Sequence, residues 1–218
     1  MLYIKKGTEP RELTEYKVQP GANYDDFRDK DAVRSALLDE QGGLCAYCMS
    51  RITLHTMKIE HWNAQHAPDG SGISMELDYR NMLGVCRGNE GSSYQEQTCD
   101  AHRRNKPLHI DPQNHDMIAK IRYQSNGIIF SDDGVIDHDL NDVLNLNCTR
   151  TYLIENRKAA ITALQSYLQK QQKGGTWSVA VLNKAKVHFQ SKKDGLYFPY
   201  LGTILYFIDH YMKKSSRN

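Results

Sequence analysis

The chain has 218 residues with a formal net charge of +2, and 39% of its residues are hydrophobic and 25% charged. This length and composition are typical of a soluble globular protein with one sizeable core, and no apolar run approaches the roughly 20 residues of a membrane span. The sequence also begins without an apolar signal region, so it predicts a cytoplasmic protein that has no membrane partner.

Charge is distributed unevenly along the chain. Residues 150–218 hold 12 Lys and Arg against 3 Asp and Glu, whereas residues 1–149 hold 16 against 23. A basic C-terminal part fits nucleic acid, an acidic protein partner, or simply solvated helix faces, and the sequence leaves all three open.

In chain order, the first clear element is a helix over residues 29–41. Val33, Ala36 and Leu37 lie on one face of it, and Gly42-Gly43 end it. The segments expected as short strands in this half are residues 2–5, 51–54 and 57–62, with the last two forming a hairpin.

The other segments of this half are expected to be largely irregular. Residues 10–28 are polar, and residues 64–76 and 87–98 are polar loops that contain glycine. The Gly and Ser content of the second loop favours mobility. A short helix is expected from Asp100, an acidic residue suited to a first helical turn.

After Pro112 the pattern changes to a hairpin and helices. Asn126-Gly127 supplies a tight hairpin turn within residues 121–131. Apolar residues at helical spacing then predict three helices, at residues 150–171, 177–191 and 200–213. The predicted organisation is an N-terminal strand and helix segment, a core, and a hairpin with a helical region, at residues 1–44, 45–112 and 113–218.

The cysteines indicate a metal site. Cys45 and Cys48 form a Cys-x2-Cys pair, which in a reducing compartment more often binds metal than forms a disulfide. Cys86 and Cys99 are separated by twelve residues and are the candidates for the other two ligands of a tetrahedral zinc ion. Four unrelated thiols, or the first pair completed by histidines, remain open. Cys148 lies outside the pattern and is expected to be an ordinary buried thiol.

Glu60-His61 stands between the two cysteine pairs. Hydrolysis of a phosphodiester needs a base for the attacking water and a cation for the leaving oxygen, and these two residues offer a base and an oxygen ligand. Neighbours on a regular strand face opposite ways, so both serve one site only if the strand ends or twists there. Asn81 and Asp100 follow; taken alone, they fit a turn residue and an N-cap.

In this order the residues resemble an HNH nuclease of the zinc-bound ββα-metal kind. More specifically, the sequence is similar to the HNH endonucleases of Septu-type anti-phage systems, including those associated with retrons. The stretches that carry this similarity are residues 33–48, 81–86, 99–100 and 144–147.

The resemblance implies an α+β fold: a zinc-bound ββα-metal, treble-clef-like core flanked by an N-terminal helical segment and a C-terminal helical bundle. It also implies the effector subunit of a defence complex with an ABC-type ATPase. In the retron versions the complex adds a reverse transcriptase and its RNA-linked DNA.

The resemblance also implies residue roles. Glu60 would bind catalytic Mg²⁺ or Mn²⁺, His61 would be the general base, and Asn81 would tie the loop backbone. Asp100 stands where His or Asn is usual and would be the second metal ligand, with His102 as the competing candidate. The ligands of the structural zinc would be Cys45, Cys48, Cys86 and Cys99. The residues expected to contact the scissile phosphate are Arg103 and Arg104.

Two other functions remain open at this stage. One is an HNH nuclease directed at RNA, for example tRNA, because the reaction attacks a phosphate and other contacts select the sugar and base. The other is a zinc-stabilised nucleic-acid-binding subunit without catalysis, which would have no use for Glu60-His61. The sequence also departs from the HNH pattern, since the usual Pro soon after the catalytic His is absent.

Overall fold

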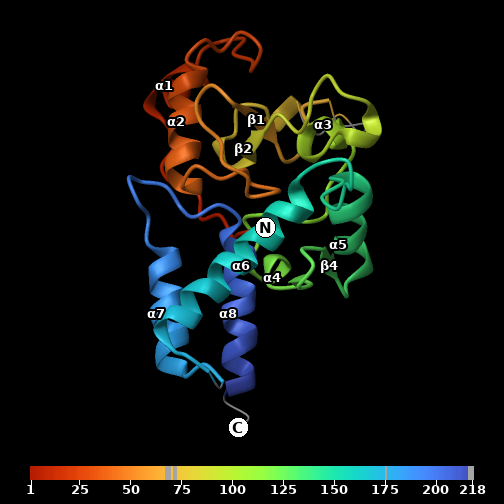
Figure 1. Ribbon diagram of the computed structural model, residues 1–218. Helices are drawn as coiled ribbons and strands as arrows, with labels where there is room; N and C mark the ends of the chain where they lie inside the picture. Colours follow the sequence, from red (N-terminus) through yellow and green to blue (C-terminus); the bar gives the residue numbers. More distant parts are fainter. Residues whose placement is uncertain (67–69, 71–72, 175, 216–218) are drawn as a thin grey trace.

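The computed structural model describes residues 1–66, 70, 73–174 and 176–215, so part of the loop expected at 64–76 lies outside the described residues. Within them the chain is α+β, with two antiparallel two-stranded sheets among helices (Figure 1). The strands are β1 (Met57–His61), β2 (Met82–Cys86), β3 (Ile121–Tyr123) and β4 (Ile129–Ser131). The helices are α1 (Arg11–Tyr16), α2 (Lys30–Gln41), α3 (Cys99–Arg103), α4 (His115–Ile118), α5 (Gly134–His138), α6 (Leu153–Gln171), α7 (Val179–Gln190) and α8 (Leu201–Ser215).

The first sheet pairs β1 with β2, and α2 packs against it. Met57 lies opposite Cys86, and His61 lies opposite Met82. The helix buries Val33 and Leu37, as the sequence pattern predicts. It ends at Gln41, whose side-chain amide donates to the Leu44 and Gly84 carbonyls, both at 2.7 Å. This buried amide therefore fixes the end of the helix against the edge of β2.

The predicted hairpin between residues 51–54 and 57–62 is wrong. Residue 57 begins β1, which pairs with β2 and not with the segment before it, although Thr53 and Thr56 close a tight turn between the two predicted segments. The residues of the first segment bond to the turn after α2 instead, since the Ile52 amide donates to the Gly43 carbonyl. Residues 2–5 also form no strand, and the segment expected to be irregular at 10–28 contains α1.

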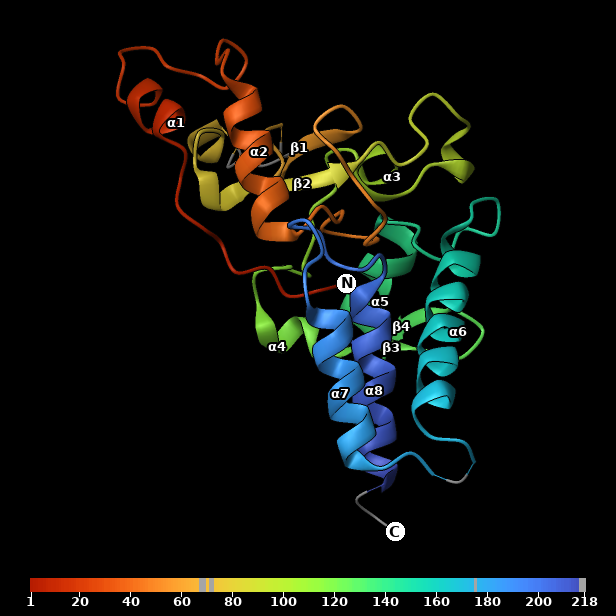
Figure 2. The same ribbon diagram turned by 60° about the vertical axis from the view of Figure 1, so that its left-hand side comes forward.

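The second half contains the predicted hairpin and the three predicted helices. Gly127 at the β3–β4 turn has φ +90°, and a Cβ there would lie 2.3 Å from the Ile154 carbonyl oxygen, so the turn packs against the start of α6. Arg157 of α6 is buried and donates to the Gly127 and Leu146 carbonyls. Helices α6, α7 and α8 pack against one another (Figure 2). None of the helices described is long and apolar enough to cross a membrane.

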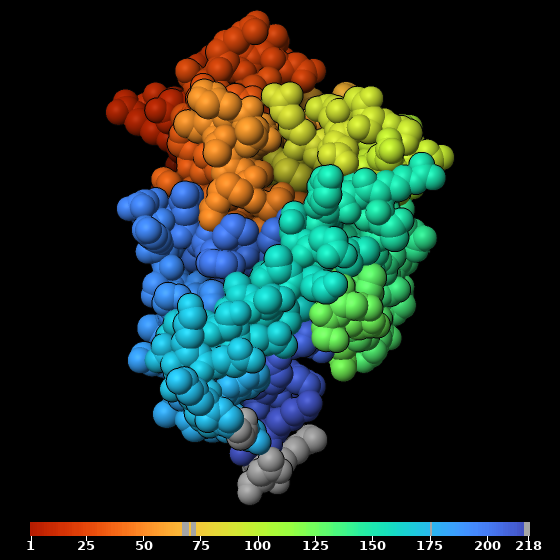
Figure 3. All heavy atoms as spheres, viewed as in Figure 1, coloured from red at the N-terminus to blue at the C-terminus, as the bar shows by residue number. Residues whose placement is uncertain are grey.

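The part of the chain after residue 112, which contains α6, α7 and α8 and is called the helical part below, contacts the turn that contains Cys45 and Cys48. The Met49 carbonyl accepts from the Tyr200 amide at 3.1 Å, and the Met49 sulfur lies 3.2 Å from the Gly202 amide nitrogen. Arg51 donates to the Tyr197 carbonyl. Figure 3 shows the residues before 112 and the helical part in direct contact. A single hydrophobic cluster includes residues from both sides of residue 112.

Gly202 provides a test of this attachment. A Cβ at Gly202 would lie 2.3 Å from the Met1 carbonyl oxygen and 2.8 Å from the Met49 sulfur. We expect Gly202→Ala to lower the free energy of unfolding by about 1–3 kcal/mol, as overpacking does. The matched control is Gly134→Ala in the first turn of α5, where nothing lies within 4 Å; it should change stability by less than about 1 kcal/mol. Urea unfolding measures both, and equal effects would contradict the tight contact.

Candidate metal centre and candidate active site

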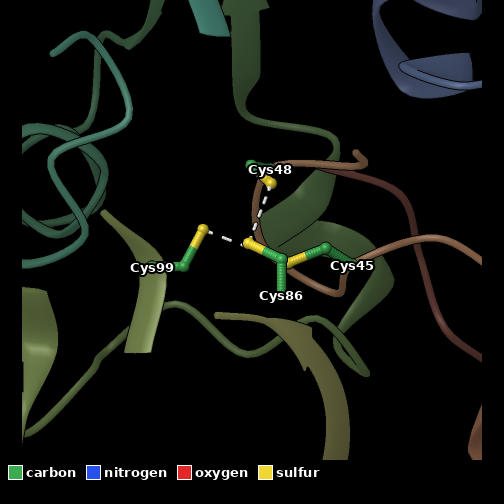
Figure 4. Close-up of side chains that lie close together, drawn as sticks. All are labelled: Cys45, Cys48, Cys86 and Cys99. Atoms are coloured by element: carbon green, nitrogen blue, oxygen red, sulfur yellow. Dashed lines mark hydrogen bonds between the residues drawn. The ribbon is translucent and has the colours of Figure 1, made fainter. Parts of the chain in front are cut away.

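Four cysteines from three parts of the fold meet at one point. Their sulfur atoms all lie within 4.8 Å of one another and point inward (Figure 4). Cys45 Sγ is 4.0 Å from Cys99 Sγ, and Cys48 Sγ is 3.7 Å from Cys86 Sγ. Sulfurs around a tetrahedral zinc ion are separated by roughly 3.8 Å, given Zn–S bonds of about 2.3 Å. The spacing therefore fits a metal centre, and all the cysteines of the described chain are free thiols.

Local backbone geometry brings these thiols together. Gly42 and Gly43 have φ of +58° and +67° and turn the chain from α2 into the cysteine pair. Met49 adopts φ 63°, and its amide donates to the Cys45 carbonyl at 3.0 Å, which closes the turn around Cys48. Cys99 also has a positive φ, 53°, at the start of α3. Residues with side chains rarely take this conformation, so the cluster is a strained arrangement that a bound ion would stabilise.

The protonation chemistry of the cluster also fits a cation. Burial raises the pKa of the Cys45 thiol well above its usual range. Hydrogen bonds from Cys45 and the other cysteines lower the pKa of Cys48 well below its usual range. The buried thiols of the cluster therefore cannot all ionise on their own, whereas a zinc ion bound by thiolates would supply the missing positive charge.

Glu60 is a buried carboxyl at the end of β1. Its Oε1 accepts from the Tyr47 hydroxyl at 3.2 Å and from Arg103, and the residue is 7% exposed. Burial raises the pKa of Glu60 to about 8, and the nearby Asp100 charge adds to the shift while Arg103 opposes it. The charges of these two predicted metal ligands are therefore close enough to interact.

His61 lies beside Glu60 and is equally buried. Its Nε2 is 2.9 Å from the Glu76 carbonyl oxygen, and the Tyr24 ring packs edge-on against the imidazole at 4.5 Å. A carbonyl can only accept, so Nε2 carries the proton and Nδ1 keeps its lone pair. Burial lowers the pKa of His61, which favours the neutral ring.

Asn81 ties the chain that follows His61. Its Oδ1 accepts from the Asn63 amide at 2.7 Å, and its Nδ2 donates to the Asn63 and Met75 carbonyls at 3.0 and 3.2 Å. The Trp62 amide donates to the Asn81 carbonyl at 2.8 Å. β1 therefore ends at His61 with the next two residues fixed. The side chains of Glu60 and His61 are both buried, and both residues belong to the β1–β2 ladder, in which neighbouring side chains point to opposite faces.

Asp100 and His102 differ sharply in their surroundings. Asp100 Oδ2 is 2.7 Å from Lys58 Nζ, and its side chain is 16% exposed. His102 is about 200° farther around the helix; its Nδ1 lies 3.0 Å from the Val143 carbonyl oxygen, and its ring stacks on Tyr94. The structure therefore brings Asp100 to Glu60 and directs the alternative ligand His102 elsewhere.

The expected phosphate contact of Arg103 does not fit the structure. Arg103 is 0% exposed and donates to Glu60, to the His61 carbonyl at 2.9 Å and to the Lys106 carbonyl at 2.9 Å. A guanidinium with these partners is a buried structural cation. Arg104 is exposed and stays a candidate for binding phosphate.

The loop at 87–98 is tied down, in contrast to the expected mobility. The Asn145 side chain donates to the Gln95 and Gln97 carbonyls at 3.2 and 2.9 Å, and the Cys148 thiol to the Gln95 carbonyl at 3.2 Å. Cys148 is buried as expected. Sequence reasoning missed these anchors, and the stretch 144–147 was the one signal that could have indicated them.

Comparisons with known proteins add no name to this geometry. No family model matches the sequence, and no curated protein matches it.

Replacing one metal-centre cysteine tests the cluster. We expect Cys45→Ala to lose the bound zinc and to unfold this region, because structural zinc contributes folding free energy directly. Cys148→Ala is the matched control, since it removes a buried thiol outside the cluster. Elemental analysis and thermal unfolding with and without a chelator measure the outcome. A Cys45→Ala protein that keeps zinc and full stability would contradict the metal centre.

Adjacent arginines give a second test. Arg103→Leu removes the cation paired with the buried Glu60 and leaves the His61, Trp62 and Lys106 carbonyls without this donor, so we expect a loss of roughly 3–5 kcal/mol in unfolding free energy. Arg104→Leu changes an exposed residue and should stay within about 0.5 kcal/mol of the parent. Denaturant unfolding of the two zinc-loaded variants separates them, and a mild effect at Arg103 would disprove its structural role.

Proposed function

We propose that this protein is a metal-dependent HNH endonuclease that hydrolyses nucleic-acid phosphodiester bonds. The observation that supports it most is that the carboxyls of Glu60 from β1 and Asp100 from α3 are close enough to affect each other's charge, and that Glu60 is followed directly in the chain by a buried imidazole with a defined tautomer. Glu60, His61 and Asp100 are also the residues that the motif order along the chain and the resemblance to HNH nucleases indicate.

His61 is suited to be the general base. Its Nε2–H is occupied by the Glu76 carbonyl, so Nδ1 is the atom that can take a proton from an attacking water. The lowered pKa keeps the ring neutral near pH 7 and therefore able to accept that proton. Asn81 acts as a positioning residue, because it holds the backbone directly after the base.

Glu60 and Asp100 are the residues that would hold a hydrolytic Mg²⁺ or Mn²⁺. Their oxygen donors suit a hard cation, and because burial raises the pKa of Glu60 to about 8, further positive charge beside it would favour the ionised carboxylate. Lys58 supplies part of that charge at Asp100, from a side chain that is 35% exposed and therefore able to move away. A bound cation would supply stabilisation of charge on the leaving oxygen.

In this proposal the zinc ion is structural. Its four ligands are protein side chains, which leaves no open position for substrate. Cys86 ends β2 and Cys99 begins α3, so zinc would hold the strand pair against the helix that carries Asp100. That arrangement of two strands, a helix and a metal would correspond to the ββα-metal, treble-clef-like core of HNH nucleases.

The proposed biological role follows from the sequence resemblance. We propose that the chain is the effector subunit of a Septu or retron anti-phage complex with an ABC-type ATPase, in the retron case together with a reverse transcriptase and its RNA-linked DNA. The helical part with its excess of Lys and Arg is the candidate surface for one of these partners.

One observation favours a second function, a nucleic-acid-binding subunit without catalysis. Glu60 is paired with Arg103 and Asp100 with Lys58, so both carboxyls already have cationic partners in the folded chain. In a protein that only binds nucleic acid, these ion pairs would only stabilise the fold. Metal-dependent cleavage separates the two functions.

The experiment is a cleavage assay with Mg²⁺ or Mn²⁺ on plasmid DNA, single-stranded DNA and tRNA, with and without the partner ATPase. We expect His61→Ala to keep its fold and zinc but to lose at least about 100-fold in rate, as expected for removal of a general base. His55→Ala is the control, because His55 is exposed and belongs to the same part of the chain.

The outcomes are distinct. Cleavage that needs both the cation and His61 supports the nuclease and identifies its nucleic acid. Equal cleavage by His61→Ala and the parent would disprove the assignment of the base. No cleavage under any condition, by zinc-loaded protein with its partner, would favour the binding subunit.

A further inference from the structure

A stack of side chains stands beside the candidate active site, and the proposed mechanism does not use it. The Tyr94 ring lies nearly parallel to the His102 imidazole, with a centroid distance of 4.1 Å and an interplanar angle of 16°. The Arg104 guanidinium lies over the same Tyr94 ring at 4.7 Å, and Lys106 Nζ is 2.8 Å from the Tyr94 hydroxyl. We call Tyr94, His102, Arg104 and Lys106 the Tyr94 stack.

The Tyr94 stack is fixed in place by its surroundings. The His102 ring is held by the Val143 carbonyl at 3.0 Å. Tyr94 begins the short 3₁₀ turn Tyr94–Glu96, which Ser93 and Glu96 close with a capping box. Asn145 holds the backbone on either side of Glu96. A ring and its cations are therefore held ready before any ligand arrives, which reduces the entropy cost of binding.

The cations of the Tyr94 stack are free of acidic partners. In the part of the chain that the structure describes, neither Arg104 nor Lys106 has a carboxylate within ion-pair distance, although both side chains are exposed. Arg104 also adopts φ 55° and ψ −128°, a conformation rarely taken by residues other than glycine. The chain thus bears local strain at the residue that brings a cation over the ring.

The position relates the stack to the candidate active site. Asp100 and His102 belong to the same short helix, and Arg104 and Lys106 follow it directly. Because Asp100 and His102 are about 200° apart around α3, the Tyr94 stack lies on a different side of this helix from the carboxyls, and a strand bound there would pass around the helix to reach them.

We propose that the Tyr94 stack binds single-stranded nucleic acid. An unpaired base would stack on the plane of the Arg104 guanidinium, which already lies over Tyr94, and Lys106 would contact an adjacent phosphate. Aromatic faces beside cations bind single strands in this way, whereas the bases inside a duplex have their faces already covered. The inference deepens the proposed nuclease function by naming its substrate class, and as a substrate site it rests on that function.

The test is binding without cleavage. Zinc-loaded His61→Ala protein is titrated into labelled oligothymidylate, oligouridylate and a DNA duplex, and fluorescence anisotropy gives each affinity. Adding Tyr94→Ala should weaken binding to single strands by roughly tenfold, as loss of a stacking side chain does, and should change duplex binding much less. Tyr94→Phe keeps the ring and should retain most of the affinity. The two single strands tell whether DNA or RNA is preferred.

Charge and position are controlled with further variants in the same background. Arg104→Ala should weaken single-strand binding and reduce its salt dependence by about one ion. Lys173→Ala removes the same charge beyond the end of α6, and Tyr152→Ala removes a ring that is 81% exposed. Both should bind like the parent.

The result that would overturn the inference is a folded, zinc-loaded Tyr94→Ala protein that binds single strands as tightly as its parent, or a parent that binds none. An equal loss for the duplex would also overturn it, because the contact would then be simple attraction to phosphate. Failure of the nuclease proposal looks different: single-strand binding would depend on Tyr94 although no metal-dependent cleavage occurs.

Discussion

The convergence of four cysteine sulfurs within 4.8 Å is the constraint on which the rest of the structure depends. The first two thiols come from the turn after α2, the third from the end of β2 and the fourth from the start of α3. Short elements of this kind bury little surface, so they need a cross-link to hold their relative positions. The same turn also receives Tyr200 and Gly202, so the helical part is attached at the metal centre.

The candidate active site depends on a second buried interaction, the pair between Glu60 and Arg103. A carboxyl and a guanidinium out of water are costly unless each is fully paired, and here Tyr47 and backbone carbonyls complete the set. The pair fixes the end of β1 against α3, and Asn81 fixes the residues that follow. Glu60 and the backbone that follows His61 are therefore held by buried, hydrogen-bonded groups, as the proposed hydrolytic site requires.

How well the sequence predicted each element depends on how many residues carry the sequence pattern of that element. Helical periodicity correctly predicted α2, α6, α7 and α8, because each has an apolar face of several residues. It missed α1, which has six residues and only Leu13 buried. The spacing of the cysteines identified four thiols that the structure brings together, whereas the roles of Glu60, His61, Asn81 and Asp100 stay predictions.

What failed were features that depend on distant contacts. Strand pairing was wrong because residues 51–54 and 82–86 both look like strands, and only the tertiary structure shows that the former belong to the cysteine turn. Arg103 and Arg104 are indistinguishable in sequence, yet one is buried and the other exposed. The Tyr94 stack combines a loop with the exit of α3, and no spacing rule connects a tyrosine with an arginine ten residues later.

The central claim is that Glu60 and Asp100 form a cation site next to a structural zinc centre. The most direct measurement is equilibrium binding of Mn²⁺ to zinc-loaded protein, followed by the loss of the free-ion electron paramagnetic resonance signal. We predict that each chain binds one Mn²⁺, that Asp100→Asn abolishes this binding, and that His102→Ala retains it. Mn²⁺ binding that is absent from the parent, or unchanged in Asp100→Asn, would contradict the account.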